Sequence, residues 1–508
     1  MGVYPIRSLM SMIMLISVRK GALPEEKVDA LVIGAFASKD GFAGEVAKLD
    51  KTMSGLIASE AKDHGFTGKI GDTLTIRIGN PVQAKRLILT GLGDVKEMNE
   101  ETAREAAAAA FNRAKGNGAK RLAFVLLGEG KIPAKGCAKA MVEGLRLAAY
   151  AFEHYKSEKT KLKIEEIAIL AANARDAKAA EEGVVLGEMY AAATVCARDL
   201  VNAPSVHMSP KDLLAAAEAA VKKQKGVRIK SYDKAGLEKM GAGGILGIGQ
   251  GSDHEPVLVH MTYKPMYAKK KIALVGKAIT FDSGGLSIKP AGSMETMKLD
   301  MAGAAAVIGA FSVIAKLAPN AEVHGIFGAC ENMPSGKAIR PGDVVRTLNG
   351  KTIEIRNTDA EGRVTLADTL AYAAKLKPDL IVDLATLTGA CVVALGEDIT
   401  GLMSNDPKAA AKVLAASMGA GEQMWELPLE PKYRHDIISD IADYKNDGPR
   451  WGGAITAGLL LKEFVNDVPW VHLDIAGPAF AEKPVNAYTR KGASGHGTRT
   501  LLELLRMV

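Results

Sequence analysis

The feature that most constrains the fold is an alternation of short apolar segments with longer helical ones along most of the chain. The apolar segments are rich in Val, Ile and Leu and are bounded by Gly, Pro or charged residues, which is typical of strands. Strands that alternate with helices favour a mainly parallel sheet with helices on both faces. The sequence therefore predicts an α/β protein built from three-layer α/β/α domains.

The chain of 508 residues is too long for one ordinary core, so we expect at least two domains. An uninterrupted helical pattern at 177–200, ended by Asn202-Ala-Pro204, is a natural connector. We predict a smaller amino-terminal domain (1–173), a connecting helix (174–200) and a larger domain (201–508). The first domain is expected to contain strands at 14–19, 30–36, 73–78, 86–91, 121–127 and 164–170 and helices at 100–115 and 135–155.

The larger domain repeats the alternation and carries every candidate site. Its expected strands are 227–232, 257–263, 272–275, 321–327, 353–355, 380–384 and 470–473, and its expected helices are 210–224, 304–317, 364–376 and 454–466. Its acidic candidates follow predicted strands. Open α/β sheets bind ligands at the carboxyl ends of their strands, so we expect the site there.

Composition excludes several classes of protein. Apolar content of 48% with 24% charged residues is typical of a globular chain rather than a disordered one. The four cysteines are far apart and form no CxxC pair, which favours reduced thiols in a cytoplasmic protein over disulfides or a zinc knuckle. No apolar run reaches the roughly 20 residues of a membrane helix. The net charge of +7 permits contact with DNA without demanding it.

The first residues have two interpretations. Residues 7–18 have the length and the basic flank of a signal-peptide core, but Arg19 and Lys20 follow at once and no small-x-small cleavage site is present. We therefore expect residues 1–14 to be a short extension that leads into the first strand. Met10, Met12 and Met14 are alternative starting positions.

The chemistry is concentrated in the segment Asn357-Thr-Asp-Ala-Glu-Gly-Arg363. If its backbone is extended, Asp359, Glu361 and Arg363 all face the same side. Segments 275–289 and 297–300 add two carboxylates and two lysines, at Lys277, Asp282, Lys289 and Asp300. Two cations held by such a set can activate a water and polarise a carbonyl together, so we predict a two-metal hydrolytic site.

Single acidic residues are usually solvated, but these have unusual neighbours. Gly284 and Gly285 follow Asp282 closely, and Gly362 follows Glu361, so the backbone can approach a ligand. Oxygen-rich ligand sets suit Mg²⁺ or Mn²⁺, and Zn²⁺ also accepts carboxylates. A lysine ligates a metal only when its amine is neutral, whereas Lys289 and Arg363 are suited to stabilise an oxyanion. Arg363 is also suited to hold bicarbonate.

Other familiar motifs are absent from the sequence. His254-Glu255 begins like HExxH, but the next histidine is His260, inside a predicted strand, so this is not a zincin site. The nine histidines are scattered and are expected to be mostly structural. No GxxxxGK[ST] or GxSxG segment is present, and the glycines of 241–251 do not form a dinucleotide fingerprint.

Together these blocks resemble the leucine aminopeptidase (cytosol aminopeptidase) family, whose signature is NTDAEGR. Further matching blocks are 330–334, 340–343, 383–389 and 472–477. The likeness covers the second domain strongly and the first only in arrangement. Ala278 and Val364 depart from the usual glycine and leucine without removing a ligand. Pro478 and Ala479 stand where larger residues often shape the pocket, which bears on substrate preference.

The resemblance implies a leucine-preferring aminopeptidase with two divalent cations, Mn²⁺ or Zn²⁺, and an attacking hydroxide that bridges them. It implies a tighter metal site at Lys277, Asp282, Asp300 and Glu361, and a more exchangeable one at Asp282, Asp359 and Glu361. It makes Lys289 and Arg363 catalytic, with bicarbonate held at Arg363 as general base. It implies a substrate pocket lined by Met297, Thr386, Gly389, Ala476 and Ala479. Family members are homohexamers that act on peptides.

Two rival functions stay open at this point. Some bacterial members also bind DNA as architectural or regulatory proteins, although no basic run or recognition helix stands out in this sequence. A non-catalytic binding protein descended from an enzyme is the other rival, and the presence of all seven expected metal and catalytic residues speaks against it.

Overall fold

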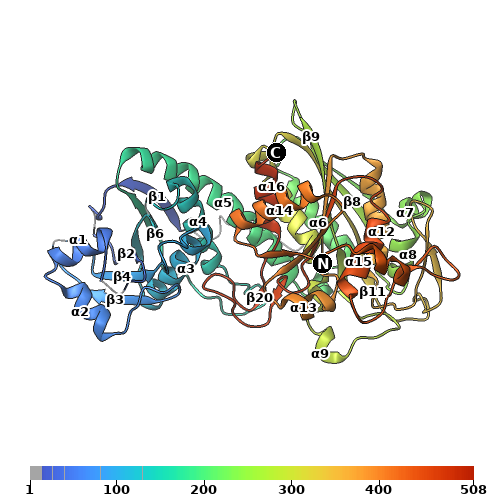
Figure 1. Cartoon of the computed structure of the whole chain (residues 1–508), viewed down its shortest axis with the longest axis horizontal. Coiled ribbons are helices and arrows are strands. Elements are labelled where there is room, and N and C mark those ends of the chain that lie inside the picture. The colour runs from blue at the N-terminus through green and yellow to red at the C-terminus, as the bar shows by residue number, and fades with distance from the viewer. Residues whose placement is uncertain (1–13, 26, 39–40, 81, 129) are drawn as a thin grey trace. The chain divides into compact units, whose positions relative to one another are not determined.

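The computed structural model describes residues 14–508 except residues 26, 39–40, 81 and 129 (Figure 1). Of the predicted extension 1–14, all but Met14 lies outside the described residues. The described chain forms two compact units: a smaller one made of 14–191 and Lys483–Lys491, and a larger one made of Ala192–Glu482 and Gly492–Val508. The border falls within the long helix α5 (Ala174–Asn202). The α/β class with a smaller first unit is confirmed, whereas the predicted domain limits stay a prediction.

The smaller unit has a six-stranded sheet in the order β1-β6-β5-β2-β4-β3. All neighbouring pairs are parallel except β3 with β4, so the sheet is mainly parallel, as predicted. The strands are β1 (Leu15–Lys20), β2 (Ala30–Ala35), β3 (Thr73–Arg77), β4 (Arg86–Gly91), β5 (Arg121–Val125) and β6 (Glu166–Ala171).

Helices cover both faces of this sheet because successive side chains of its strands point to opposite faces and most of them are apolar. Leu31 and Ile33 belong to the cluster that packs under α1 (Gly44–Thr52) and α2 (Leu56–Asp63). On the other face, the Thr90 hydroxyl donates to the Ala106 carbonyl of α3 (Glu100–Gly116) at 2.9 Å, and α4 (Ala134–Ala149) packs against α3. The helix predicted at 135–155 ends earlier, at Ala149, because Tyr150 has extended dihedral angles (φ −63°, ψ 138°). Arg490 donates to the Ala148 carbonyl at 3.2 Å near this end.

The larger unit contains a nine-stranded sheet whose main path runs β16-β15-β18-β14-β9-β11-β8-β7, with β10 paired to β11. The central strands β18, β14, β9 and β11 are parallel, whereas β15, β8 and β7 join in antiparallel fashion. The strands are β7 (Val227–Tyr232), β8 (Val257–Tyr263), β9 (Lys270–Gly276), β10 (Ala278–Asp282), β11 (Ala321–Asn332), β14 (Leu380–Ala385), β15 (Thr400–Ser404), β16 (Met424–Glu426) and β18 (Trp470–Asp474).

Short strands complete the unit in two small sheets. One has the order β12-β13-β17, and the other pairs β19 with β20. These strands are β12 (Val344–Arg346), β13 (Thr352–Glu354), β17 (Tyr444–Lys445), β19 (Phe480–Ala481) and β20 (Gly492–Ala493). β13 belongs to the small three-stranded sheet and is followed closely by the segment 357–363, so this sheet holds the start of that segment.

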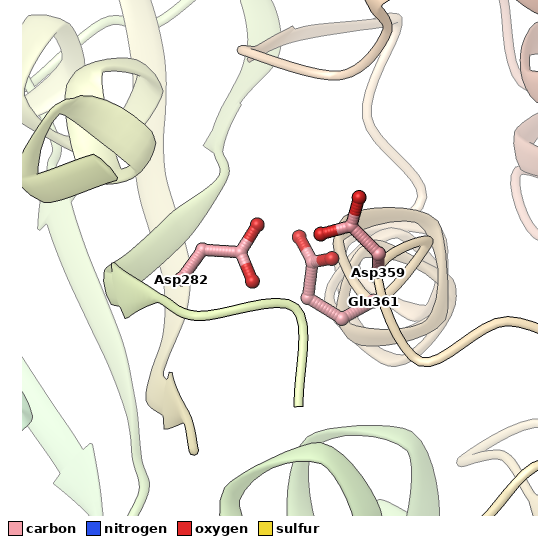
Figure 2. A group of neighbouring side chains, drawn as sticks. All are labelled: Asp282, Asp359 and Glu361. Carbon is pink, nitrogen blue, oxygen red and sulfur yellow. The ribbon is translucent and has the colours of Figure 1, made fainter. Parts of the chain in front are cut away.

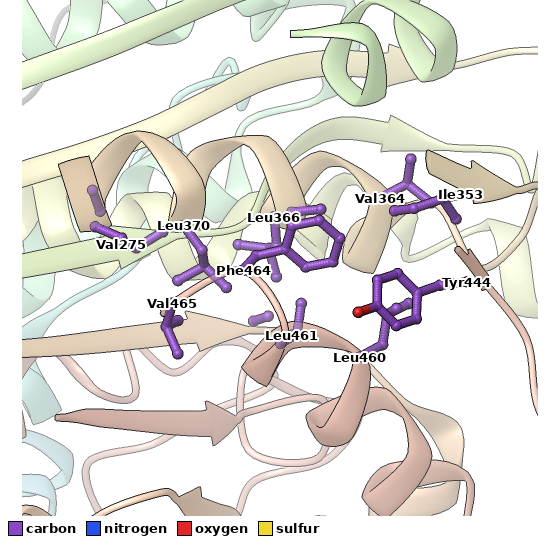
Figure 3. Packing of buried hydrophobic residues seen from close by; sticks show 14 of the residues in the cluster. Val275, Ile353, Val364, Leu366, Leu370, Tyr444, Leu460, Leu461, Phe464 and Val465 are labelled. Carbon is purple, nitrogen blue, oxygen red and sulfur yellow. The ribbon is translucent and has the colours of Figure 1, made fainter. Parts of the chain in front are cut away.

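Two helical layers enclose the large sheet. On one face, Val275 of β9 packs with Leu370 of α12 (Gly362–Lys375) and Phe464, which follows α15 (Gly453–Lys462), in one buried apolar cluster (Figure 3). The other layer includes the wholly buried α10 (Ala302–Phe311), which packs against α16 (Thr498–Arg506) and α6 (Pro210–Val221). Further helices are α7 (Lys234–Met240), α8 (Gly243–Gly249), α9 (Ala291–Met294), α13 (Gly389–Leu395) and α14 (Pro407–Ala420).

One predicted helix of the larger unit is divided. The pattern at 304–317 predicts a single helix, but α10 ends at Phe311 and a separate turn, α11 (Ile314–Leu317), follows. The Gln224 amide donates to the Ser312 carbonyl at 2.5 Å and accepts from the Ala315 N–H at 3.2 Å. The break is stable because a distant side chain satisfies its backbone groups. None of the helices among the described residues combines the length and hydropathy that a bilayer span requires.

Candidate metal centre

Three carboxylates converge at the edge of the large sheet (Figure 2). Asp282 is the last residue of β10, Asp359 lies in the turn before α12, and Glu361 immediately precedes that helix. Their ligand oxygens lie within 4.8 Å of one another, and the burial of Asp282 and Glu361 is nearly complete. Like charges this close repel strongly unless a cation lies among them.

The conformation of the signature segment differs from the extended backbone that we predicted. Asn357 starts a turn in which its side-chain oxygen accepts from the Asp359 N–H at 2.9 Å. Glu361 already has helical dihedral angles, φ −74° and ψ −33°, and Arg363 is in the first turn of α12. Asp359 and Glu361 therefore converge because an Asn-initiated turn runs into a helix, not because of a strand's alternation.

Lys277 links the fourth carboxylate to this group. Its Nζ lies 2.7 Å from Asp300 Oδ1 and 2.9 Å from Glu361 Oε1. It also donates to the Thr386 carbonyl at 2.9 Å. A Cβ on Gly362 would lie 2.4 Å from Lys277 Cε, so any larger residue there would push the lysine side chain out of this position.

Lys289 is the second lysine that forms ion pairs with carboxylates of the group. Its Nζ lies 2.9 Å from Asp282 Oδ2 and 2.5 Å from Asp359 Oδ1. The loop before it turns back sharply at Gly284, where φ is +84° and a Cβ would meet the Ser287 carbonyl at 2.5 Å. The glycine after Asp282 thus brings the chain back so that Lys289 faces the same carboxylates.

The pKa values of the group show that burial outweighs the attraction of the lysines at three of its carboxylates. Burial raises the pKa of Asp300, Glu361 and Asp359 above the ordinary value, against the attraction of the lysines. Burial alone would lower the pKa of Lys277, but Asp300, Glu361 and Asp282 raise it. Within the described residues, Asp300 Oδ2 and Glu361 Oε2 are buried and accept no hydrogen bond. Unpaired buried carboxylate oxygens are what divalent cations bind, so the residues fit a metal centre.

Arg363 lies at the border of this group and is half-buried. Its Nε has no hydrogen-bond partner in the described part of the chain. Burial lowers the pKa of its guanidinium, while Glu361, Asp474 and Asp447 oppose that effect. The arginine therefore carries an unused donor that suits a small oxyanion.

The five predicted pocket residues occupy three loops of the same unit. Met297 begins the 3₁₀ turn that contains Asp300, and the Thr386 hydroxyl donates to Asp300 Oδ1 at 2.7 Å. An added Cβ on Gly389 would meet no atom within 4 Å, so open space adjoins the start of α13. Ala476 is half-buried, and Ala479 is buried.

The Asp474 carboxylate ties two of these loops together. It accepts from the backbone N–H groups of Leu387 at 3.2 Å and Thr388 at 3.4 Å on one loop, and from that of Ala476 at 3.2 Å on the other. The loop that holds Thr386 and Gly389 therefore lies beside the loop that holds Ala476. Asp474 belongs to the block 472–477, for which the sequence suggested no role.

Asn332 is a site residue that sequence reasoning missed. Its side-chain amide donates to Asp282 Oδ1 at 2.8 Å and to the Thr358 carbonyl at 3.0 Å. It therefore holds the end of β10 against the turn that carries Asp359. The block 330–334 contains Asn332, but local sequence offers no sign that an amide at the end of β11 bridges two distant segments.

Comparisons with known proteins identify the family to which the chain belongs. The profile of the cytosol aminopeptidase family, catalytic domain, matches residues 195–502, and that of its N-terminal domain matches residues 32–159. The chain is 45% identical over 478 residues to a probable cytosol aminopeptidase of Nostoc punctiforme, covering 93% of this chain and 95% of that protein. It is 42% identical over 502 residues to one of Alkaliphilus oremlandii, with 97% and 99% covered.

Solved structures are similar as well. A mutant of tomato leucine aminopeptidase has a TM-score of 0.87 at 33% identity and covers 97% of both chains. The bottromycin maturation enzyme BotP in complex with Mn has a TM-score of 0.83 at 36% identity, covering 94% of this chain and 99% of that one. The catalytic-domain match contains the whole carboxylate–lysine group. The chain belongs to the cytosol aminopeptidase family and is a metallo-aminopeptidase.

Proposed function

We propose that this chain removes amino-terminal residues from peptides, with a preference for leucine-like side chains, and that it uses two divalent cations. The observation that carries the proposal is the convergence of Asp282, Asp359 and Glu361 within 4.8 Å, extended to Asp300 through Lys277. The tighter cation would be held by Lys277, Asp282, Asp300 and Glu361. The more exchangeable cation would be held by Asp282, Asp359, through its side chain and backbone carbonyl, and Glu361.

The donor set supports this assignment. Asp300 Oδ2 and Glu361 Oε2 are buried without a hydrogen-bond partner among the described residues, so each has a lone pair for a cation. Lys277 would have to lose a proton to ligate a cation. Two nearby cations would favour that loss because they lower the pKa of its amine. When bound, the cations supply Lewis acidity for the scissile carbonyl and an acidified water. Mn²⁺ and Zn²⁺ both suit such ligands.

Lys289 would act on the reacting carbonyl. Asp282 and Asp359 hold its Nζ at 2.9 Å and 2.5 Å, and they help keep its pKa raised, so the side chain stays a fixed cation. A positioned ammonium stabilises the oxyanion that develops when water adds to a carbonyl. Arg363, with its unused Nε–H, would hold bicarbonate, which supplies a general base.

The proposed preference for leucine-like residues depends on the pocket formed by Met297, Thr386, Gly389, Ala476 and Ala479. The open space beside Gly389 and the small side chains of Ala476 and Ala479 leave room for a branched apolar group. The Thr386 hydroxyl donates its proton to Asp300, so it can offer a substrate side chain only an acceptor. Family likeness further supports a homohexamer that works in the cytoplasm on peptides.

The deciding experiment is hydrolysis of leucine p-nitroanilide by protein stripped with a chelator and reloaded with Mn²⁺ or Zn²⁺. We expect turnover to vanish on stripping and to return with about two metals per chain. Alanine, lysine and aspartate anilides measure the preference, and bicarbonate-free buffer tests the role of Arg363. Failure of every metal to restore turnover in a folded protein would favour the non-catalytic binding protein. Equal kcat/KM for all anilides would refute the leucine preference alone.

A further inference from the structure

A second group of metal-ligating side chains lies in the larger unit, apart from the carboxylates. His260 is on β8 and His324 on β11, two antiparallel neighbours in which His324 pairs with Thr262 and Ile326 with His260. The two imidazoles are thus diagonal neighbours on one face of the sheet. His260 Nε2 lies 2.9 Å from His324 Nδ1. The Thr262 hydroxyl oxygen is 3.1 Å from the first nitrogen and 3.5 Å from the second.

The outer nitrogen of His260 has a hydrogen-bond partner, and that of His324 lies near a carboxylate. His260 Nδ1 lies 3.1 Å from the Tyr372 hydroxyl, which is 3.3 Å from the Tyr232 hydroxyl. His324 Nε2 lies 3.1 Å from Glu322 Oε1. Carboxylates and hydroxyls on the outer nitrogen orient the histidine ligands of metal sites and leave the inner nitrogen to face the ion.

Both imidazoles are available as ligands at neutral pH. Burial lowers the pKa of His260 to about 4, helped by His324 and Lys230. Burial, Lys271 and Lys264 also lower the pKa of His324, although Glu322 raises it. Neutral imidazole is the form that binds metals, so no proton has to be removed from a charged ring.

We propose that His260 and His324 form a second metal site, specific for a late divalent transition metal such as Cu²⁺ or Ni²⁺, with the Thr262 hydroxyl beside it. With metal–nitrogen bonds of about 2.0 Å, two nitrogens 2.9 Å apart subtend about 90° at the ion. That angle suits the tetragonal geometry of Cu²⁺ and Ni²⁺ with nitrogen and oxygen ligands. His260 and Thr262 are half-buried, whereas His324 is buried, so solvent reaches the pair from the side of His260 and Thr262.

Binding requires only a shift of one proton. In the metal-free pair one N–H lies between the two facing nitrogens, because each neutral ring has one donor and one acceptor. On binding, His260 takes its proton on Nδ1, where the Tyr372 oxygen accepts it, and both facing nitrogens present lone pairs. The negative charge of Glu322, 3.1 Å from His324 Nε2, favours the tautomer of His324 that carries its proton on Nε2. No proton leaves the site, and no redox step occurs.

The second site is separate from the catalytic centre. His324 is eight residues before Asn332 on the continuous strand β11, which is about 26 Å along the strand. The two sites also differ in chemistry, since the first offers carboxylates with one amine and the second offers imidazoles. A nitrogen-sensitive measurement therefore separates them.

The test is electron paramagnetic resonance of Cu²⁺ added at one to three equivalents to the protein loaded with diamagnetic Zn²⁺. We expect a bound Cu²⁺ whose signal shows coupling to two nitrogen nuclei, with no matching release of Zn²⁺. H260Q and H324Q are each expected to lose that signal, whereas H254Q, which changes an exposed histidine, is expected to keep it.

Two readouts keep the test decisive if a variant is unstable. Thermal unfolding and leucine p-nitroanilide turnover of the Mn²⁺ form report whether H260Q and H324Q are folded, and T262V retains both imidazoles and is expected to bind more weakly. The spectrum of the wild-type protein tests for two-nitrogen coupling without any variant. A spectrum without two-nitrogen coupling, or one that H260Q and H324Q leave unchanged, would overturn the proposal whatever the peptidase assay shows.

Discussion

Each unit of the molecule buries a cluster of opposite charges, and both clusters contain two carboxylates for each cation. In the smaller unit the Arg104 side chain is fully buried, with Glu143 Oε2 at 2.7 Å from its Nε and Glu101 also paired to it. In the larger unit Lys277 and Lys289 face four carboxylates. Burial alone would lower the pKa of Arg104, yet Glu143 and Glu101 raise it.

We infer that the first cluster supports the fold, whereas the carboxylates of the second suit the proposed cations. Around Arg104 the chain supplies its own counter-charges, so the ion pairs hold α3 to α4. Around Lys277 the pKa values of Asp300 and Glu361 are raised by burial, and each keeps an unpaired oxygen in the described structure. A buried group with surplus charge destabilises the chain and is retained where function needs it.

The largest effect is expected from Glu361→Gln. It removes a carboxylate shared by both proposed cations, so metal content should fall below two per chain and kcat/KM by about 10³-fold or more. Elemental analysis and leucine p-nitroanilide turnover measure both. The metal-free variant should unfold no more easily than metal-free wild type, because Lys277 keeps Asp300 and a repelled charge is gone. Glu238→Gln, on an exposed face of α7, is the matched control. Full metal content in E361Q would refute the ligand assignment.

The opposite pattern is expected from Glu143→Gln in the smaller unit. It leaves the buried Arg104 with a single carboxylate partner and should cost about 3 kcal/mol of stability, with metal content and turnover per folded chain unchanged. Amide hydrogen exchange in α3 and α4 measures the loss. Glu45→Gln, which breaks an exposed pair with Lys48, should change stability by less than about 0.5 kcal/mol. Equal exchange rates in E143Q and E45Q would abolish the contrast between the two clusters.

Lys289→Ala separates catalysis from metal binding inside the larger cluster. The proposed role is to stabilise the oxyanion, so kcat should fall by about 10²-fold to 10³-fold while both metals stay bound. Lys289→Arg keeps the charge in another shape and should recover part of the rate. Metal analysis beside steady-state kinetics gives the answer. Loss of metal together with rate would make Lys289 a structural support of Asp282 and Asp359 instead.

Sequence patterns predicted the α/β class, most strands and the residues of the cluster, since these depend on local periodicity and residue type. They failed where a distant side chain decides the backbone. Gln224 divides the helix predicted at 304–317, and the Asn446 amide donates to the Asn357 carbonyl at 2.7 Å, which helps turn a segment predicted as extended. Partners this far along the chain leave no trace in a local pattern.

The same limit applies to side chains that meet across strands. The nine histidines look scattered in sequence, and only the register of β8 with β11 brings His260 to His324. Asn332 likewise gains its position from three separate segments. The domain limits and the assigned roles of the site residues stay predictions until the variants are measured.

The smallest effect concerns Asn332, which touches the cluster without carrying charge. Its amide holds both Asp282 Oδ1 and the Thr358 carbonyl, so Asn332→Ala frees the end of β10 from the signature turn. Loss of such an outer partner costs about 10-fold to 100-fold in metal affinity or activity. Titration of stripped protein with Mn²⁺ should show weaker binding, and excess Mn²⁺ should recover most of the turnover. Asn332→Asp keeps the shape of the side chain but adds a fifth carboxylate, which should displace Asp282 by repulsion. We expect N332D to bind Mn²⁺ at least as tightly as N332A. If N332A binds Mn²⁺ like wild type, the geometry of the cluster depends on its other contacts, namely the two lysines, the Gly284 N–H on Asp282 and the Thr386 hydroxyl on Asp300.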